Sequence, residues 1–350
     1  MTRLPENHIA LFIFGDSYFE SGNNNYINTT TFFQANFPPY GETFFKYANG
    51  RFSDGRVISD FIAEYAKLPP IPPFLHPEHR DDEYIYGVNF ASAGAGALAE
   101  TNPGFVIGLK TQSLYFAQVI KQWRLKLGEE KANKLLSTAV YIFSIGGNDY
   151  AAPFYTKFSN GLFPYSKQKF VDFVIGNITT AIKEIYIEGG RKFGFLNVLP
   201  PDCTPFLRRF VNGTTIEECL EKEASKLARL HNNALLKVLQ DFEKQLEGFK
   251  YSILNLYDAL LQLMKYPSKY GFEEGNVACC GGGSYRGDFS YGGKRGIEEY
   301  ELCNNVRKHV YFDSSHLTES AAEHFAQLMW NGSNDVIDSY NLEQLFLKTF

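Results

Sequence analysis

The sequence has no apolar run long enough to cross a bilayer. A membrane-spanning helix needs about 20 apolar residues, whereas the apolar stretch at residues 9–14 is interrupted at once by Gly15 and Asp16. Met1 leads almost directly into this stretch, with neither a basic region nor a small-residue cleavage site, so no signal peptide is visible. We therefore expect no transmembrane segment. The alternative that the sequence is a mature form from which a signal peptide was trimmed stays open.

Cysteine and excess positive charge are also scarce. Five cysteines in 350 residues are too few for a disulfide scaffold, and without a Cys-x-x-Cys pair zinc ribbons and thioredoxin-like redox sites lack their usual signature. Cys203 and Cys219 flank one polar loop, and three more cysteines lie around a Gly-rich one, which favours loop-stapling disulfides in an oxidising compartment. With 34 Lys+Arg against 39 Asp+Glu, no basic excess is available for a phosphate backbone, so nucleic acid is not an expected partner.

What the sequence does have is a repeated alternation of strand and helix patterns. Hydrophobic residues make up 44% and charged residues 21%, as in an ordinary globular protein with a sizeable core. Short β-branched or aromatic runs predict five strands, at residues 9–14, 86–90, 139–145, 193–199 and 251–256. Amphipathic spacing predicts helices at residues 53–67, 111–127, 165–189, 217–247 and 318–330. This alternation predicts an α/β fold with a mainly parallel sheet between two helical layers.

Neither a repeat nor a sharp change of composition divides the chain. The Pro-rich segment at 67–83 and the Gly-rich segment at 271–296 are expected to be loop excursions from one core rather than linkers. We therefore predict a single domain over residues 1–350.

Ser17 is the first candidate for chemistry. The first predicted strand runs into Gly15, Asp16 and Ser17, so a hydroxyl group follows a glycine turn at the carboxyl end of a strand, where α/β proteins bind ligands. Ser17 is either a nucleophile, which needs an adjacent base and a group that orients the base, or a residue that only caps a turn.

Asp313 and His316 supply the missing base and its orienting group. A carboxylate three residues before a histidine in a turn can accept the Nδ1 hydrogen while Nε2 points away. Of seven histidines, only His316 has such a local partner. His76 and His79 are spaced like metal ligands, but Pro77 and the surrounding loop make a metal site unexpected.

Two more glycine-rich strand ends suggest an oxyanion hole. Gly94 follows the second predicted strand and Asn148 follows the third, so the backbone N–H groups of Ser17 and Gly94 and the Asn148 amide can converge on a developing oxyanion. Each of these residues on its own is more often part of a tight turn, but together they follow three successive strands. The α/β-hydrolase elbow, the phosphate-binding P-loop and the zinc-binding helix motif are missing from the sequence, and neither metal nor cofactor is expected.

Four separated blocks of the sequence resemble those of the plant branch of the GDSL esterase/lipases, or SGNH hydrolases. The blocks are Gly15-Asp16-Ser17 with Gly22-Asn23-Asn24, Asn89-Phe90-Ala91-Ser92 with Gly94, Gly146-x-Asn148-Asp149, and Asp313-x-x-His316. Residues 50–56 add a supporting similarity. The resemblance covers nearly the whole chain.

The resemblance implies a flavodoxin-like α/β/α sandwich and a catalytic triad. Ser17 would be the nucleophile, His316 the base and Asp313 its orienting group, with Gly94 and Asn148 as oxyanion donors beside the Ser17 amide. It also implies a secreted, glycosylated protein whose signal peptide has been removed. The sequence departs from the family pattern at Glu20, usually Asp, at Ala93, usually Gly, and at Leu317, usually Pro. These substitutions border the site and are expected to be able to shift it, which would reduce or redirect activity.

The expected function is therefore cleavage of carboxylic esters through an acyl-serine intermediate. Aromatic residues make up 16% of the chain, and Phe32, Phe33, Phe37, Tyr40, Phe44 and Phe45 cluster beyond the nucleophile, which suggests an apolar acyl or aromatic substrate, unless the rings belong to the core. Two alternatives stay open. A bound alcohol can replace water as acceptor, which gives an ester synthase of specialised metabolism, or the chain is a catalytically weak binding or accessory protein.

Overall fold

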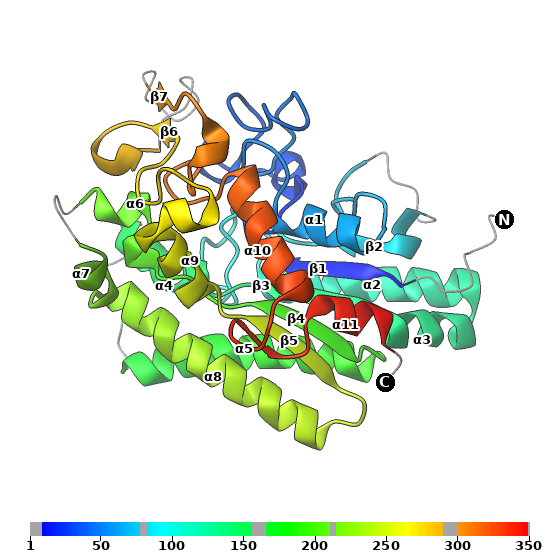
Figure 1. Cartoon of the computed structure of the whole chain (residues 1–350). Helices are drawn as coiled ribbons and strands as arrows, with labels where there is room; N and C mark the ends of the chain where they lie inside the picture. Colours follow the sequence, from blue (N-terminus) through cyan, green and yellow to red (C-terminus); the bar gives the residue numbers. More distant parts are fainter. Residues whose placement is uncertain (1–8, 78–82, 156–165, 211–214, 290–299, 349–350) are drawn as a thin grey trace.

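A mainly parallel sheet forms the centre of the molecule (Figure 1). The structure is a computed structural model that describes residues 9–77, 83–155, 166–210, 215–289 and 300–348. Within these residues the sheet has six strands in the order β2-β1-β3-β4-β5-β8. The strands are β1 Leu11–Gly15, β2 Gly87–Asn89, β3 Val140–Ser144, β4 Lys192–Leu196, β5 Lys250–Leu254 and β8 Ile337–Ser339. A separate antiparallel pair is formed by β6 Cys280–Gly281 and β7 Glu301–Leu302.

The predicted fold class is confirmed. Strands β1 to β5 pair in parallel, and each coincides with one of the five predicted strands. Their order, with β1 between β2 and β3, is that of flavodoxin-like proteins. The sixth strand, β8, was not predicted, and it pairs antiparallel with β5 at the edge of the sheet.

Helices cover both faces of this sheet (Figure 1). Helices α2, α3, α5 and α8 pack together on one face, and α1, α10 and α11 on the other. The helices are α1 Ile58–Tyr65, α2 Leu109–Leu127, α3 Glu129–Thr138, α4 Gly147–Tyr155, α5 Lys167–Ile187, α6 Pro205–Arg208, α7 Ile216–Leu220, α8 Glu223–Gln245, α9 Leu256–Lys265, α10 Glu319–Asn331 and α11 Leu342–Leu347.

Much of the aromatic content stacks between the sheet and α2. Phe14, Phe143 and Phe195 are register partners on β1, β3 and β4, so their side chains point to the same face of the sheet. The ring of Phe14 lies beside that of Phe143, with centroids 4.9 Å apart, and Phe143 lies 5.3 Å from Phe195. Phe12 forms a second row with Tyr141, and Phe116 of α2 meets Phe12 edge to face at 5.0 Å. These buried rings belong to the core and fix β1, which leads to Ser17.

Two predicted segments differ in detail from the structure. The amphipathic pattern at 217–247 is divided into α7 and α8, because Lys222 has an extended backbone, and a disulfide ties Cys219 of α7 to Cys203. Residues 67–77 contain neither helix nor strand, as expected for a loop, whereas 78–82 and 290–296 of the two excursions lie outside the described residues. The single domain over 1–350 stays a prediction.

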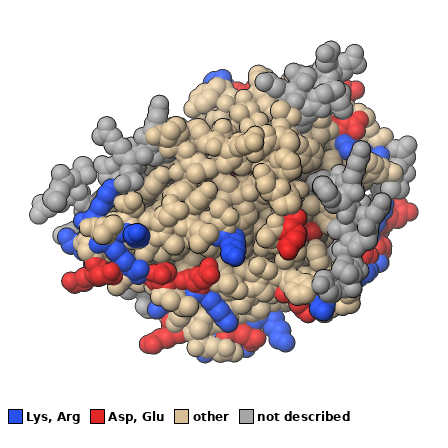
Figure 2. All heavy atoms as spheres, turned by 180° about the vertical axis from the view of Figure 1, so that it is seen from behind, with Lys and Arg blue, Asp and Glu red and all other residues tan. Residues whose placement is uncertain are grey.

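Charge is distributed without a basic stripe on the face shown in Figure 2. There, the described Lys and Arg side chains lie among Asp and Glu side chains, mostly along the lower edge, and much of the face carries neither. Within the described ranges, every helix falls short of the length and apolar character that crossing a bilayer requires.

Candidate active site

Ser17 lies at the carboxyl edge of the sheet because the chain turns sharply at the end of β1. Gly15 has φ of +142°, and a Cβ atom there would come within 2.2 Å of the Ser144 carbonyl oxygen on β3. Only glycine fits this close approach. Asp16 N–H then donates to the same carbonyl at 2.9 Å, which turns Ser17 out of the sheet and into a cleft.

The structure brings Ser17 and His316 into contact across 299 positions of sequence. Ser17 Oγ lies 2.8 Å from His316 Nε2, and His316 Nδ1 lies 2.7 Å from Asp313 Oδ1 and 2.8 Å from Oδ2. The three predicted side chains therefore form one continuous line of hydrogen bonds. In this geometry an imidazole can accept the serine proton while a carboxylate orients the imidazole, which is the arrangement that activates a serine.

Asp313 is fully buried and held on several sides. Its Oδ1 accepts the backbone N–H groups of Ser315 and His316, each at 2.8 Å, and its Oδ2 accepts the Tyr40 hydroxyl at 2.7 Å. Burial by itself disfavours the charged carboxylate, but His316 and these hydrogen bonds outweigh it and lower the pKa of Asp313 below its ordinary value. Tyr40, which sequence reasoning placed only in an aromatic cluster, therefore supports the carboxylate.

Gly94 and Asn148 line the same cleft as Ser17. Gly94 has φ of +80°, and a Cβ there would lie 2.4 Å from the ring of Phe33, so a side chain has no room. Asn148 is in the first turn of α4, and its Nδ2 donates to the Ala95 carbonyl at 2.9 Å. The positive end of this helix therefore faces the cleft.

Asp149 ties α4 to the loop that follows Gly94. Its buried carboxyl group accepts the N–H groups of Ala97 and Leu98 at 2.9 Å and 3.0 Å and the Thr101 hydroxyl at 2.6 Å. Burial raises the pKa of Asp149 to about 6, although these hydrogen bonds oppose the shift. The motif that contains Asp149 does not reveal this role in the sequence, because its partners lie about 50 positions earlier in the chain.

Asp16 places a second carboxyl group next to Ser17. It lines the cleft and accepts hydrogen bonds from the Tyr18 N–H at 3.1 Å and the Ser144 hydroxyl at 3.2 Å. Burial raises the pKa of Asp16 to about 7, against the effect of both hydrogen bonds. The group thus titrates near neutrality beside Ser17.

The walls of the cleft are mostly apolar. Beyond the polar residues already named, its lining includes Phe32, Phe33, Phe52, Val198, Leu199, Pro201, Phe206, Leu207 and Phe289. Of the aromatic cluster noted in the sequence, Phe32 and Phe33 line the cleft. Phe37 and Tyr40 pack in a second small core with Phe52, while Phe44 and Phe45 lie over arginine side chains.

The contacts among Ser17, His316 and Asp313 form although three nearby residues differ from the expected family pattern. The Glu20 carboxyl group is fully buried and accepts the Ala93 N–H at 2.6 Å, so two of the departures contact each other. Leu317 is buried beside Ser17 and His316 in a narrow pocket.

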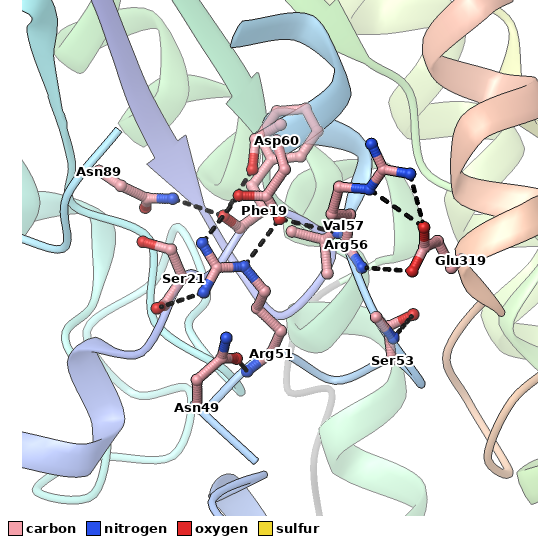
Figure 3. Close-up of polar contacts among 12 residues, drawn as sticks. Phe19, Ser21, Asn49, Arg51, Ser53, Arg56, Val57, Asp60, Asn89 and Glu319 are labelled. Carbon is pink, nitrogen blue, oxygen red and sulfur yellow. Dashed lines mark hydrogen bonds and ion pairs between the residues drawn. The ribbon is translucent and has the colours of Figure 1, made fainter. Parts of the chain in front are cut away.

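Residues 50–56 connect the segments that carry Ser17 and His316 (Figure 3). The Arg51 guanidinium donates to the Ser21 carbonyl at 3.2 Å and forms a two-pronged ion pair with Asp60 of α1. Arg56 pairs with Glu319, the first residue of α10, at 2.7 Å. The sequence of this block does not reveal these contacts, because Ser21 and Glu319 lie in other segments of the chain.

Among the described residues, the cysteines and the histidines other than His316 do not line the cleft. His231 is buried against Tyr150, and burial lowers its pKa to about 3. His79 lies outside the described residues, and no group of three metal-binding side chains occurs within them. Disulfides join Cys203 to Cys219 and Cys279 to Cys303, while Cys280 forms none, so the structure supplies the pairing that the sequence left open.

Comparison with known proteins gives a consistent family. A model described as GDSL-like lipase/acylhydrolase matches residues 11–329. GDSL esterase/lipase 5 of Arabidopsis thaliana is 52% identical over 97% of this chain and 88% of its own length. A GDSL lipase of Tanacetum cinerariifolium is 49% identical over 96% and 87%, and GDSL esterase/lipase 2 of Arabidopsis thaliana is 49% identical over 98% and 91%. With its fold, its sequence blocks and these relatives in agreement, the chain belongs to the GDSL-like lipase/acylhydrolase family.

Proposed function

We propose that this GDSL-type esterase/lipase cleaves carboxylic esters through an acyl group on Ser17. The observation that carries the proposal is the line of contacts from Ser17 Oγ to His316 Nε2, 2.8 Å, and from His316 Nδ1 to Asp313, 2.7 Å. With the Nδ1 hydrogen held by Asp313, Nε2 is left to accept the Ser17 proton.

The reaction proceeds in two steps, acylation of Ser17 and hydrolysis of the acyl-serine. Ser17 Oγ bonds to the ester carbonyl carbon while His316 Nε2 takes the hydroxyl proton, and that proton then passes to the departing alkoxide oxygen, which leaves as an alcohol. Water next attacks the acyl-serine, gives its proton to His316, and the Ser17 oxygen is released and reprotonated. The products are a carboxylic acid and an alcohol.

Three donors are proposed to stabilise the negative oxygen of the tetrahedral intermediate. They are the backbone N–H groups of Ser17 and Gly94 and the Asn148 side-chain amide. Asn148 Nδ2 carries two hydrogens. Asn148 lines the cleft, and we expect the hydrogen not directed at Ala95 to bind the oxyanion. Preorganised donors of this kind commonly supply the largest single contribution to catalysis.

The apolar walls favour an acyl group that is aliphatic or aromatic. Phe32, Phe206 and Phe289 surround one side of the cleft, with ring centroids 4.9–6.5 Å apart. Burial of an acyl chain against these rings removes apolar surface from water. The substrate is accordingly proposed to be a small-molecule ester, and two disulfides among the described residues support secretion into an oxidising compartment.

Covalent labelling with a fluorophosphonate tests the proposed nucleophile. Ser17 Oγ is expected to displace fluoride and form a phosphonate ester, with one label per chain on the Ser17 peptide by mass spectrometry. Ser17→Ala should take up none. A folded wild-type protein that stays unlabelled, or is labelled elsewhere, would overturn the assignment and favour a binding or accessory role.

The ester-synthase alternative uses the same triad and differs only in the acceptor. Incubating the protein with an acyl donor and a series of competing alcohols, then measuring new ester against free acid, separates the two. A product that is free acid alone excludes transfer to the alcohols tested.

A further inference from the structure

The loop that follows Ser17 is pinned on both sides of Glu20 (Figure 3). The Phe19 carbonyl accepts the Asn89 amide at 2.6 Å and the Ser59 hydroxyl at 3.0 Å. The Ser21 carbonyl accepts the Arg51 guanidinium at 3.2 Å. Because the carbonyl groups of both neighbours are hydrogen-bonded, the backbone of Glu20 has a defined position. The Glu20 carboxyl group can therefore hold another segment at a fixed distance from this loop.

Arg51 is itself immobilised. Its Nε and Nη2 donate to the two oxygens of Asp60 at 2.7 Å and 2.8 Å, a fork that suits guanidinium and carboxylate geometry. Both side chains are about nine-tenths buried, at 8% and 10% exposure. The hydrogen bond from Arg51 to the Ser21 carbonyl is therefore anchored to α1 through Asp60, and it is not a mobile surface contact.

The Glu20 side chain joins this loop to the loop that carries Gly94. One carboxyl oxygen accepts the Asn24 N–H and the other accepts the Ala93 N–H, both at 2.6 Å. Glu20 and Ala93 are buried, and burial raises the pKa of Glu20 to about 8 despite these bonds and the nearby Arg51 charge. Asp16 is the other charged group that acts on it.

Asn24 holds Ala93 from the other side. Its Nδ2 donates to the Ala93 carbonyl at 3.0 Å and to the Phe33 carbonyl at 2.8 Å, while its Oδ1 accepts the Ser92 hydroxyl. Both backbone polar groups of Ala93 thus bind side chains from the loop after Ser17.

These two contacts also fix the direction of the Gly94 N–H. The Ala93 carbonyl and the Gly94 N–H belong to one planar trans peptide unit, in which the two bonds point in opposite directions. When Asn24 draws the carbonyl toward itself, the N–H is turned away from Asn24. Asn102 Nδ2 holds the next carbonyl, that of Gly94, at 2.8 Å, so the peptide units on both sides of Gly94 are fixed.

We propose that Glu20 and Asn24 are positioning residues for the oxyanion donor Gly94, fixing its N–H relative to Ser17 through Ala93. This inference rests on the proposed acyl-serine reaction. The contact between Glu20 and Ala93 ties the loop after Ser17 directly to the residue before Gly94.

Two isosteric substitutions separate positioning from folding. Glu20→Gln replaces one accepting oxygen by an NH₂ group that opposes a backbone N–H, and Asn24→Asp removes the donor to Ala93 while keeping the acceptor for Ser92. Each is expected to lower kcat for a simple aryl ester by about tenfold or more, with KM changed by less than about threefold, because misplacement by a fraction of an ångström weakens transition-state binding.

Glu274→Gln is the matched control. Glu274 Oε1 also accepts two backbone N–H groups, from Asn276 at 2.6 Å and Val277 at 3.0 Å, and Glu274 does not line the cleft. Its substitution is expected to leave kcat unchanged. Combining Glu20→Gln with Asn148→Ala should cost less than the product of the single effects, because both weaken stabilisation of the same oxygen.

Fluorophosphonate stoichiometry distinguishes the possible outcomes. One label per chain in both variants, with kcat reduced and KM retained, supports positioning. Unchanged kcat in both variants, or a fall in kcat that only matches a fall in the labelled fraction, overturns it. An equal loss in Glu274→Gln does so too. Failure of the wild-type protein to label at Ser17 instead contradicts the proposed function.

Discussion

The two sides of the cleft are built differently. On the side of Ser17 and Gly94, buried polar side chains bind the backbone of neighbouring loops, as Glu20 and Asn24 do at Ala93. The other side, made by residues 198–207 and Phe289, presents mainly apolar side chains to the cleft and comes close to His316, whose ring lies 6.3 Å from that of Phe289. Hydrogen bonds fix direction, whereas apolar contact depends mainly on area and shape. The polar side is therefore suited to place reacting atoms, and the apolar side to select the acyl group.

The largest expected effect on kcat comes from removing the two side chains at the centre of the polar side, Ser17 and His316. Ser17→Ala and His316→Ala should each lower kcat by about 10⁴-fold or more, because triad members act as one unit. Circular dichroism and the melting temperature should show a folded protein in both cases. Turnover within about tenfold of the wild type in either variant would mean that the chemistry lies elsewhere.

Removing an oxyanion donor should have a smaller effect. Asn148→Ala is expected to lower kcat by about 10²–10³-fold, the range for loss of one such donor, with little change in KM. Steady-state kinetics on an activated ester measure both constants. If kcat stays within about twofold of the wild type, Asn148 does not contact the oxyanion.

The apolar side should control selectivity. Phe206→Ala is expected to lower kcat/KM for a long-chain ester by about 10–200-fold relative to an acetyl ester, as loss of apolar contacts costs about 1–3 kcal/mol. Phe173→Ala, on the exposed surface of α5, is the control and should not alter the ratio. An unchanged ratio in Phe206→Ala would place the acyl group against another wall.

The buried carboxyl groups of the polar side should make stability depend on pH. The pKa of Glu20 is raised from 4.5 to about 8, so the folded state holds this proton more tightly than the unfolded state. Its contribution is complete below the unfolded value and is lost as the pH rises toward about 8. Glu20→Gln has no proton to lose there, so its free energy of unfolding should fall less between about pH 5 and pH 9, by about 2 kcal/mol or more.

Urea unfolding of both proteins at several pH values measures this difference. Asp149, with a raised pKa of about 6, is present in both proteins, so its contribution cancels in the comparison. Asp16 acts on Glu20, so the difference between the profiles includes the coupling of these two groups. Parallel pH profiles for wild type and variant would show that Glu20 is ionised throughout.

The sequence predicted most of the parallel sheet because its strands are continuous buried runs, such as the one that ends at Gly15. It missed β8, which has only three residues and a single buried one. It also missed α4, whose first residues, Gly147 and Asn148, are typical of turns and which contains Pro153.

The candidate site was predictable where its residues occur in recognisable blocks. Ser17, Gly94 and Asn148 follow the ends of predicted strands, and Asp313 and His316 are three residues apart in a turn before the last predicted helix. The structure brings all five into one region. The supporting contacts of Tyr40, Glu20 and Arg56 were not predictable, because each partner lies in a distant segment and the contact depends on side-chain direction. The spacing of residues along the chain does not indicate which residues of distant segments contact each other.

The central claim is that Ser17 carries the acyl group during turnover. Rapid mixing with excess p-nitrophenyl ester measures this directly, provided that deacylation is the slower step, which an acyl group that fits the apolar wall favours. The account predicts a burst of about one p-nitrophenol per chain, an acyl mass on the Ser17 peptide in quenched samples, and neither signal in Ser17→Ala. A burst that persists in Ser17→Ala, or an acyl group found on another residue during turnover, would contradict it.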